Sequence, residues 1–170
     1  MERRKFITLG AAGIAAGSIP GIAVAGIQNK EKRYQKGKSP WPVCLDTATI
    51  RPASLKEKVR IAAKAGYDAI EPWDGELQKF EADGGNLKDL GKEIKDNGLF
   101  VPSVIGLWNA LPPTQELWDK SLTDTRNRMR MAADIGAQHI QTIPNTIGLN
   151  YNQKWAADRY RDIIEMGIND

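Results

Sequence analysis

Six polar or aromatic side chains follow directly after predicted strands of this sequence. They are two carboxylates, two indoles and two amides: Asp46, Glu71, Trp73, Trp108, Asn109 and Asn145. Paired carboxylates can share general acid and general base work, and an indole presents a flat apolar face to a sugar ring or another ligand. Because parallel strands end at one edge of a sheet, the sequence predicts one pocket that these side chains share.

Each of the stronger candidates also has a purely structural explanation. Asp46 can cap the loop that follows it, and Glu71 can be a solvated residue at the rim of the sheet. Trp73 and Trp108 can pack under loops, as tryptophans commonly do. The Glu71 carboxylate lies at the edge of a buried segment, residues 67–70, so it requires a polar partner in either case.

Other reactive centres are not visible in the sequence. Ser103 lacks a Gly-x-Ser-x-Gly context, and the one histidine, His139, falls near the start of a predicted strand, where we expect a structural role. No phosphate-binding glycine loop follows a strand. One histidine and no helix with clustered carboxylates leave no complete metal site. Cys44 is the only cysteine, which excludes an intrachain disulfide, and its apolar context predicts a small core residue.

Three segments share a pattern of amphipathic run, glycine and short apolar run: residues 62–73, 94–105 and 132–144. Glycine accepts the left-handed backbone that ends a helix. About five apolar residues after it are typical of a strand covered on both faces. The recurrence predicts βα units and a parallel sheet, and hence an α/β fold.

The same reasoning predicts the order of elements. Strands are expected at residues 42–48, 67–70, 99–105 and 139–143, and Pro102 is tolerable only at a bulge or strand end. Helices are expected from Ser54, which begins a capping box, from Asn86, after Thr114, and over residues 153–166. Residues 74–85 are expected to form a polar loop, and Ile168 to open a fifth strand.

Side chains at helical spacing predict the buried faces of these helices. They are Leu55, Val59, Ala62, Leu87, Leu90, Ile94, Leu122, Thr125, Met129, Ala132, Ala133, Ala156, Tyr160, Ile163 and Ile164. Trp41, Trp118 and Trp155 do not follow strands, so we expect them in the core or in helix packing.

Four parallel strands with their helices are the amino-terminal half of a TIM barrel. The chain has 170 residues, whereas a closed barrel needs about 250. The first and fourth strands then have open edges, which are association sites. The sequence is therefore either truncated, which we favour, or a half-barrel that requires a second copy or another partner.

Residues 1–25 have the features of a signal peptide: a basic start, an apolar stretch rich in Gly and Ala, and a small-residue cleavage site. Arg3 and Arg4 resemble the twin-arginine export motif, which predicts a periplasmic or secreted protein. An uncut membrane anchor is the alternative, but Pro20 and the glycines disfavour a stable spanning helix. Residues 26–41 are predicted to be a flexible linker, and residues 42–170 the incomplete barrel domain.

The charge of the chain argues against a nucleic-acid partner. The formal net charge is +3, and the basic start of the chain contributes +2 of it, which leaves +1 for residues 26–170. Nucleic-acid-binding domains carry a much stronger basic excess.

Residues 46–52 (Asp-Thr-Ala-Thr-Ile-Arg-Pro), 62–73 and 132–144 resemble the sugar phosphate isomerase/epimerase family of xylose-isomerase-like TIM barrels. The resemblance extends over about residues 42–167. It implies a divalent metal (manganese, magnesium, cobalt or zinc) held by two glutamates, an aspartate and a histidine on strands five to eight. It also implies proton movement beside a sugar carbonyl through an enediolate.

None of those ligand positions lies in this chain, so the resemblance assigns it no catalytic residue and no metal of its own. Glu71 matches the acidic residue that closes strand two in the family, and Asp46 stands where the family presents a polar residue after strand one. Both are therefore expected to line the substrate pocket without binding metal.

Two hypotheses about function follow. In the first, the chain is the amino-terminal part of an exported, metal-dependent isomerase or epimerase of a sugar or polyol, and it is inactive alone. Export favours a free sugar over a phosphorylated one. In the second, the chain is a non-catalytic carbohydrate-binding or interaction module made of a half-barrel, in a homo-oligomer.

Overall fold

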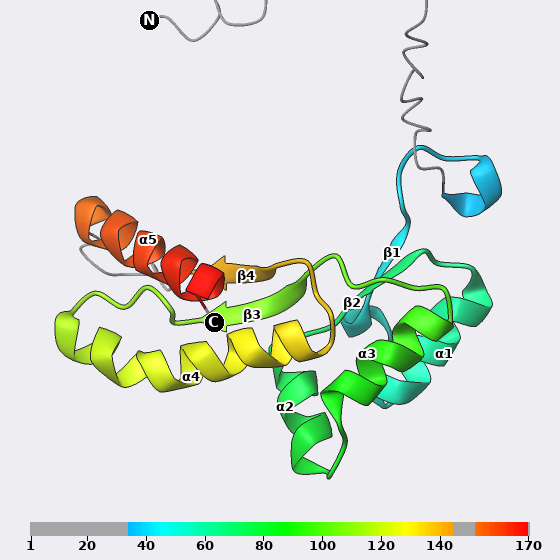
Figure 1. The fold of residues 1–170 in the computed structure, drawn as a ribbon, viewed down its shortest axis with the longest axis horizontal. Coiled ribbons are helices and arrows are strands. Elements are labelled where there is room, and N and C mark those ends of the chain that lie inside the picture. Colours follow the sequence, from blue (N-terminus) through cyan, green and yellow to red (C-terminus); the bar gives the residue numbers. More distant parts are fainter. Residues whose placement is uncertain (1–33, 145–151, 170) are drawn as a thin grey trace, which may run out of the picture. The chain divides into compact units, whose positions relative to one another are not determined.

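The computed structural model describes residues 34–144 and 152–169. Strands and helices alternate along the chain except where two helices follow the second strand (Figure 1). The elements are β1 (Cys44–Asp46), α1 (Leu55–Ala65), β2 (Ala69–Glu71), α2 (Asp74–Ala82), α3 (Leu87–Asp96), β3 (Val104–Trp108), α4 (Gln115–Asp134), β4 (Ile140–Ile143) and α5 (Gln153–Asn169).

The strands are parallel and follow one another in chain order. β1 pairs with β2, with Asp46 opposite Glu71, and β3 pairs with β4. Isolated parallel bridges, Ala69 to Phe100 and Trp73 to Ile105, connect the two pairs. The expected half-barrel of four parallel βα units is thus confirmed.

Proline explains the late start of the third strand. The sequence predicted a strand from Leu99, but β3 begins at Val104. Pro102 has no N–H to donate to a neighbouring strand, so regular pairing stops around it and resumes beyond it. The expectation that Pro102 lies at a strand end is confirmed.

Local signals set the ends of the helices as expected. The Ser54 side chain accepts from the backbone N–H of Glu57, and the Glu57 carboxylate accepts from Ser54 in return, which completes the capping box. Gly66 has φ of 84° and ends α1 in the left-handed conformation. Asn86 caps α3 by accepting from the N–H groups of Lys88 and Asp89.

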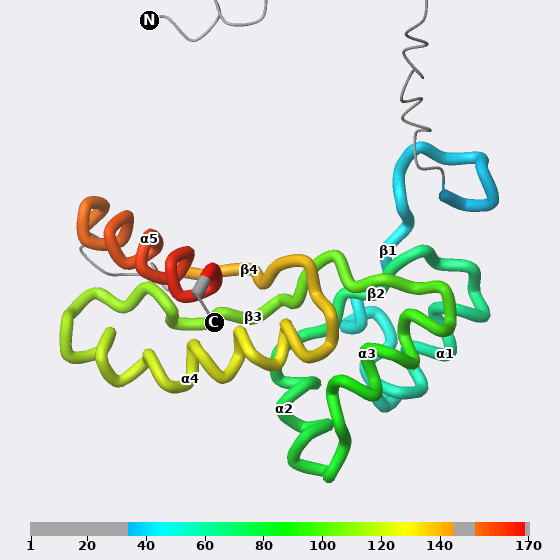
Figure 2. Tube along the Cα trace, viewed as in Figure 1, coloured from blue at the N-terminus to red at the C-terminus, as the bar shows by residue number. Residues whose placement is uncertain are grey.

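Two predictions about local structure were wrong. The expected loop after Trp73 contains α2, whose first turn is capped when Glu76 accepts from the Trp73 N–H at 3.0 Å. This helix buries only Asp74 and Leu77, so it has no apolar stripe to reveal it. Ile168 opens no strand, because α5 continues through Gly167 to Asn169 (Figure 2).

The core is divided into two clusters on the helix side of the strands. One joins β1, β2 and α1 to α3 with the start of β3 and the end of α4, and the other joins the end of β3 to α4 and α5 around Trp118. Most predicted inner positions are buried or half-buried. The exceptions are exposed: Trp41, Ala133, Tyr160 and Ile164.

The amino-terminal segments fall largely outside the described residues. Residues 1–33, which include Arg3, Arg4 and most of the predicted linker, are among them, as is Asn145. Within residues 34–144 and 152–169, no helix combines the length and apolar content needed to cross a bilayer.

Candidate functional site

A polar cluster lies on the face of the sheet opposite the helices. Glu71 Oε1 accepts a hydrogen bond from Ser103 Oγ and another, of 2.9 Å, from Gln141 Nε2. Gln141 Nε2 also lies 3.2 Å from Ser103 Oγ. We call Glu71, Ser103 and Gln141 the polar layer. It joins β2, the entry to β3, and β4, and it supplies the partner that Glu71 was expected to need.

Alternation along the strands explains why the layer faces inward. Successive side chains of a strand point to opposite faces. Leu45 and Ile70 pack in the helix-side core, so Asp46 and Glu71 point the other way. This is the face that becomes the interior when a barrel closes.

Sequence reasoning missed two members of the layer. Ser103 was considered only as a nucleophile, and Gln141 was not considered. The sequence did contain a signal for Gln141. Side chains alternate between the two faces of a strand, and Gln141 follows Ile140, which packs against the core, so Gln141 points to the opposite, inner face. Ser103 had no such signal, since it precedes β3 in an irregular segment.

Asp46 fulfils its structural role and holds a second candidate in place. Its Oδ1 accepts from the Ala48 N–H at 2.8 Å, which begins the short 3-10 helix Thr47–Ile50. The same oxygen accepts from Trp73 Nε1 at 2.9 Å. Asp46 is thus a cap, and it also fixes the orientation of the Trp73 ring.

Trp73 and Trp108 form a stacked pair at the ends of β2 and β3. Their ring centroids are 5.7 Å apart and their planes differ by 25°. Trp108 Nε1 donates to Asp74 Oδ1 at 2.9 Å, so a carboxylate anchors each indole. The Trp108 side chain remains 36% exposed, and the pair therefore offers an oriented aromatic surface to solvent.

A buried ion pair supports this aromatic pair. Asp74 Oδ2 lies 3.0 Å from Arg128 Nη1 of α4, and Asp74 is only 6% exposed. The same guanidinium donates to the Gly106 carbonyl at 3.1 Å and pairs with Asp124. One network therefore joins α2, β3 and α4 beneath Trp108.

The two amide candidates are less well defined. Asn109 is exposed and has φ of 57°, a left-handed conformation typical of a turn residue at a strand end. Asn145 lies outside the described residues. His139, which we expected to be structural, stands just before β4 and is exposed.

Cys44 was wrongly predicted to be a buried core residue. It shares the inner face with Asp46, because Leu45 between them points into the helix-side core, and it is exposed. Partial burial, followed by the charges of Glu71 and Asp46, raises the pKa of the Cys44 thiol from its ordinary value of 9.0 to about 11. Both carboxylates therefore act on the same region of the inner face.

We expect Cys44 to react slowly with alkylating reagents at neutral pH. A rise from 9.0 to about 11 leaves about 100-fold less thiolate than in an unperturbed thiol, and the thiolate is the reactive form. Glu71→Gln removes a negative charge, lowers the pKa and should accelerate iodoacetamide labelling several-fold. Cys44 is the only cysteine, so the labelling rate against pH reports on it alone.

Glu116→Gln on α4 is the matched control, because Glu116 is exposed and pairs with Lys120. It should leave the rate unchanged. Equal labelling rates in Glu71→Gln and the unaltered chain would contradict the placement of Cys44 beside Glu71.

The described residues do not fit a metal ion. No group of three or more His, Cys, Asp or Glu side chains among them is arranged to hold one. Donors already occupy Glu71 Oε1 and Asp46 Oδ1. We therefore derive no catalytic step through a metal held by this part of the chain.

The fold resembles that of several solved structures. The probable 3-DHS dehydratase AsbF from Bacillus anthracis is 17% identical, with a TM-score of 0.62, and the match covers 76% of this chain and 49% of that one. The IolI protein with a bound zinc atom is 17% identical, with a TM-score of 0.63, and the match covers 76% of this chain and 47% of that one. A D-psicose 3-epimerase crystallised in the presence of D-fructose is 14% identical, with a TM-score of 0.57, and the match covers 76% of this chain and 49% of that one.

The chain thus spans about half the length of these structures, and at such identities the likeness shows the fold alone. No curated protein matches the sequence. The model of the xylose isomerase-like TIM barrel family matches residues 59–166. The chain therefore belongs to the xylose isomerase-like TIM barrel family.

Proposed function

We propose that this chain contributes the amino-terminal half of an exported, metal-dependent isomerase or epimerase of a sugar or polyol. The observation that carries the proposal is the polar layer beside the Trp73–Trp108 pair. Glu71 and Trp73 are two residues apart at the carboxyl end of β2, where parallel β/α folds bind ligands. Carboxylate, amide and hydroxyl groups next to an aromatic face suit a polyhydroxylated substrate.

The inner-face side chains have complementary tasks in this proposal. Glu71 accepts hydrogen bonds from substrate hydroxyls, and Gln141 and Ser103 can donate or accept as the substrate requires. The exposed ring of Trp108 packs against the C–H face of the sugar, while Asp46 and Asp74 keep the two indoles in orientation. These residues bind and orient the substrate.

The family also suggests a divalent metal: manganese, magnesium, cobalt or zinc. The zinc atom in the IolI structure supports this part of the proposal. Since residues 34–144 and 152–169 supply no metal site, its ligands are proposed to lie elsewhere in the whole protein. The twin-arginine pattern at Arg3 and Arg4 supports export to the periplasm or beyond. A non-catalytic carbohydrate-binding module is less favoured, because similar solved structures are named as a dehydratase and as epimerases.

We expect Glu71→Gln in the whole protein to raise KM for its sugar roughly 10- to 100-fold, because a hydrogen bond to a charged group contributes about 1.5–3 kcal/mol. Metal content should stay unchanged, since Glu71 is proposed to bind substrate only. Steady-state kinetics on a panel of free ketoses and polyols, with metal analysis of each variant, makes the measurement.

Glu116→Gln, on an exposed turn of α4, is the control and should change neither quantity. Loss of metal in Glu71→Gln would contradict the role assigned to Glu71. Binding of no sugar or polyol by the unaltered protein would contradict the proposed substrate class itself.

A further inference from the structure

Helix α1 buries one charged side chain on its apolar face. Lys58 lies between Leu55 and Ala62 on the buried side of the helix, and it is only 3% exposed. Lysine is almost never fully buried unless its ammonium group has partners. The apolar stem packs well against a core without help from the charge, so the ammonium group requires an explanation of its own.

The ammonium group of Lys58 lies at the end of the sheet that carries the candidate site. Because α1 connects the parallel strands β1 and β2, its first turn starts beside the carboxyl end of β1. Lys58 stands in that turn. Its Nζ donates to the Thr47 carbonyl at 3.0 Å and to Glu76 Oε1 of α2. The charge is therefore held between the residues that follow β1 and β2.

Glu76 connects Lys58 to the backbone of Trp73. Its Oε2 accepts from the Trp73 N–H at 3.0 Å and from Thr47 Oγ1. Thr47 is fully buried and directly follows Asp46, which accepts from the indole N–H of Trp73. Lys58 therefore contacts both anchors of Trp73. Through Glu76 it acts on the backbone N–H, and through the Thr47 carbonyl it acts on the turn that carries the anchor of the ring.

Packing alone does not fix the position of Trp73. A recess of about 360 Å³ borders this residue, and its lining includes Ala48, Arg51 and Gly75. Trp73 is only partly buried. Hydrogen bonds, rather than close contacts on every side, therefore determine where its ring lies.

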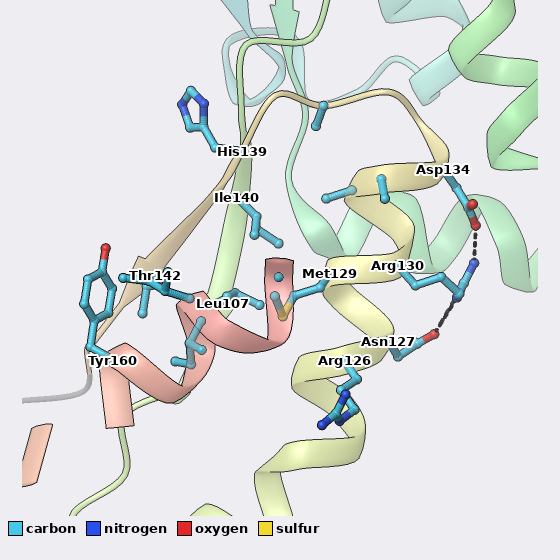
Figure 3. Close-up of a pocket in the computed structure, with 16 residues that line it drawn as sticks. Leu107, Arg126, Asn127, Met129, Arg130, Asp134, His139, Ile140, Thr142 and Tyr160 are labelled. Carbon is cyan, nitrogen blue, oxygen red and sulfur yellow. Dashed lines mark hydrogen bonds and ion pairs between the residues drawn. The ribbon is translucent and has the colours of Figure 1, made fainter. Parts of the chain in front are cut away.

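The burial of Lys58 does not follow simply from its place beside a recess. A larger cavity, of about 710 Å³, lies between α4, β4 and α5, and Arg130 is one of the residues that line it (Figure 3). Arg130 pairs with Asp134 at 2.6 Å and still remains 45% exposed. Lys58 is almost completely removed from water, which costs free energy that its bonds must offset. Those bonds lead to the residues that hold Trp73.

We propose that Lys58 is a positioning residue, which keeps the Trp73–Trp108 pair in the orientation that meets the substrate. It acts through Glu76 and Thr47 and touches no substrate itself. A buried ion pair adds little net stability compared with apolar side chains of similar size, whereas its directed bonds select one geometry for Trp73. The effect on sugar affinity rests on the proposed function, but the effect on the geometry of the two indoles does not.

Lys58→Met in the whole protein tests the proposal, because methionine keeps most of the apolar stem and removes the charge. We expect KM to rise about 3- to 10-fold with little change in kcat, for the ketose or polyol that the unaltered protein turns over fastest. The near-UV circular dichroism of the stacked indoles should weaken without any sugar present. Lys56→Met is the matched control on α1, because Lys56 is 50% exposed and pairs with Glu93. It should change neither quantity.

Two double variants separate positioning from a loss of stability. Lys58→Met with Glu76→Met replaces the buried pair by apolar side chains, which should restore stability, but it leaves the Trp73 N–H without its acceptor. KM should therefore stay high. Lys58→Met with Glu76→Gln removes the unpaired charge and keeps an oxygen that accepts from the Trp73 N–H. It should recover most of the KM and of the dichroism, and urea unfolding should show that both double variants are folded.

Equal KM values in the two double variants would overturn the proposal. So would a raised KM in Lys58→Met with unchanged dichroism of the indoles. If the unaltered protein turns over no ketose or polyol, the proposed function is contradicted, and the dichroism of the same variants still decides whether Lys58 positions Trp73.

Discussion

Replacing Asp74 by alanine should lower the free energy of unfolding by about 3–5 kcal/mol, the cost of leaving one charge of a buried pair without its partner. Asp74 is 6% exposed and faces Arg128, whose side chain is 16% exposed. Loss of the carboxylate removes the buried partner of the Arg128 guanidinium, which then keeps only the Gly106 carbonyl and Asp124, a carboxylate that is 54% exposed. It also removes the acceptor for Trp108 Nε1. We expect the effect in equilibrium urea unfolding at fixed protein concentration.

Two comparisons separate this ion pair from general surface effects. Asp96→Ala breaks the exposed pair of Asp96 with Lys92 and should change the free energy of unfolding far less, because solvent screens exposed pairs. Asp74→Asn keeps an oxygen that can accept from Trp108, so it should preserve more of the near-UV circular dichroism of the stacked tryptophans than Asp74→Ala does. Equal costs for Asp74→Ala and Asp96→Ala would refute the buried network.

Gly106→Ala should lower the free energy of unfolding by about 1–3 kcal/mol, because it overpacks a filled space. A Cβ on Gly106 would overlap Asp74 Cβ and lie 2.6 Å from Asp74 Cγ. Helix α2 and strand β3 cannot move apart freely to relieve the overlap, because Arg128 binds both Asp74 of α2 and the Gly106 carbonyl of β3. The same urea experiment, with near-UV circular dichroism of Trp108, measures the change.

Gly75→Ala is the control for the glycine substitution. No atom lies within 4 Å of a Cβ built on Gly75, and alanine favours the helix, so stability should rise by up to about 1 kcal/mol. In an Asp74→Gly background the clashing side chain is gone, and Gly106→Ala should then cost much less. An undiminished cost in that background would show that the close approach to Asp74 is not its cause.

The side chains on the inner face of the sheet were only partly predictable from the sequence. Glu71 was expected to need a polar partner because it stands at the end of a buried run of residues, which is visible in its immediate sequence neighbours. Its partners were not predictable, because Ser103 and Gln141 are 32 and 70 residues away along the chain. Only the register of β2, β3 and β4 brings the three side chains together.

The sequence by itself determined the succession of βα units, the glycine and capping-box ends of the helices, and the strand end at Pro102, because these depend on periodicity and backbone conformation within a few residues. The tertiary structure decided that the segment after Trp73 forms helix α2 rather than a loop. It also decided which indole N–H each carboxylate accepts from, and on which face of the sheet Cys44 lies. These depend on contacts between elements distant in sequence, such as Asp74 with Arg128 and Asp46 with Trp73. Pairing and packing energies act only once the strands are in register, so no local pattern encodes them.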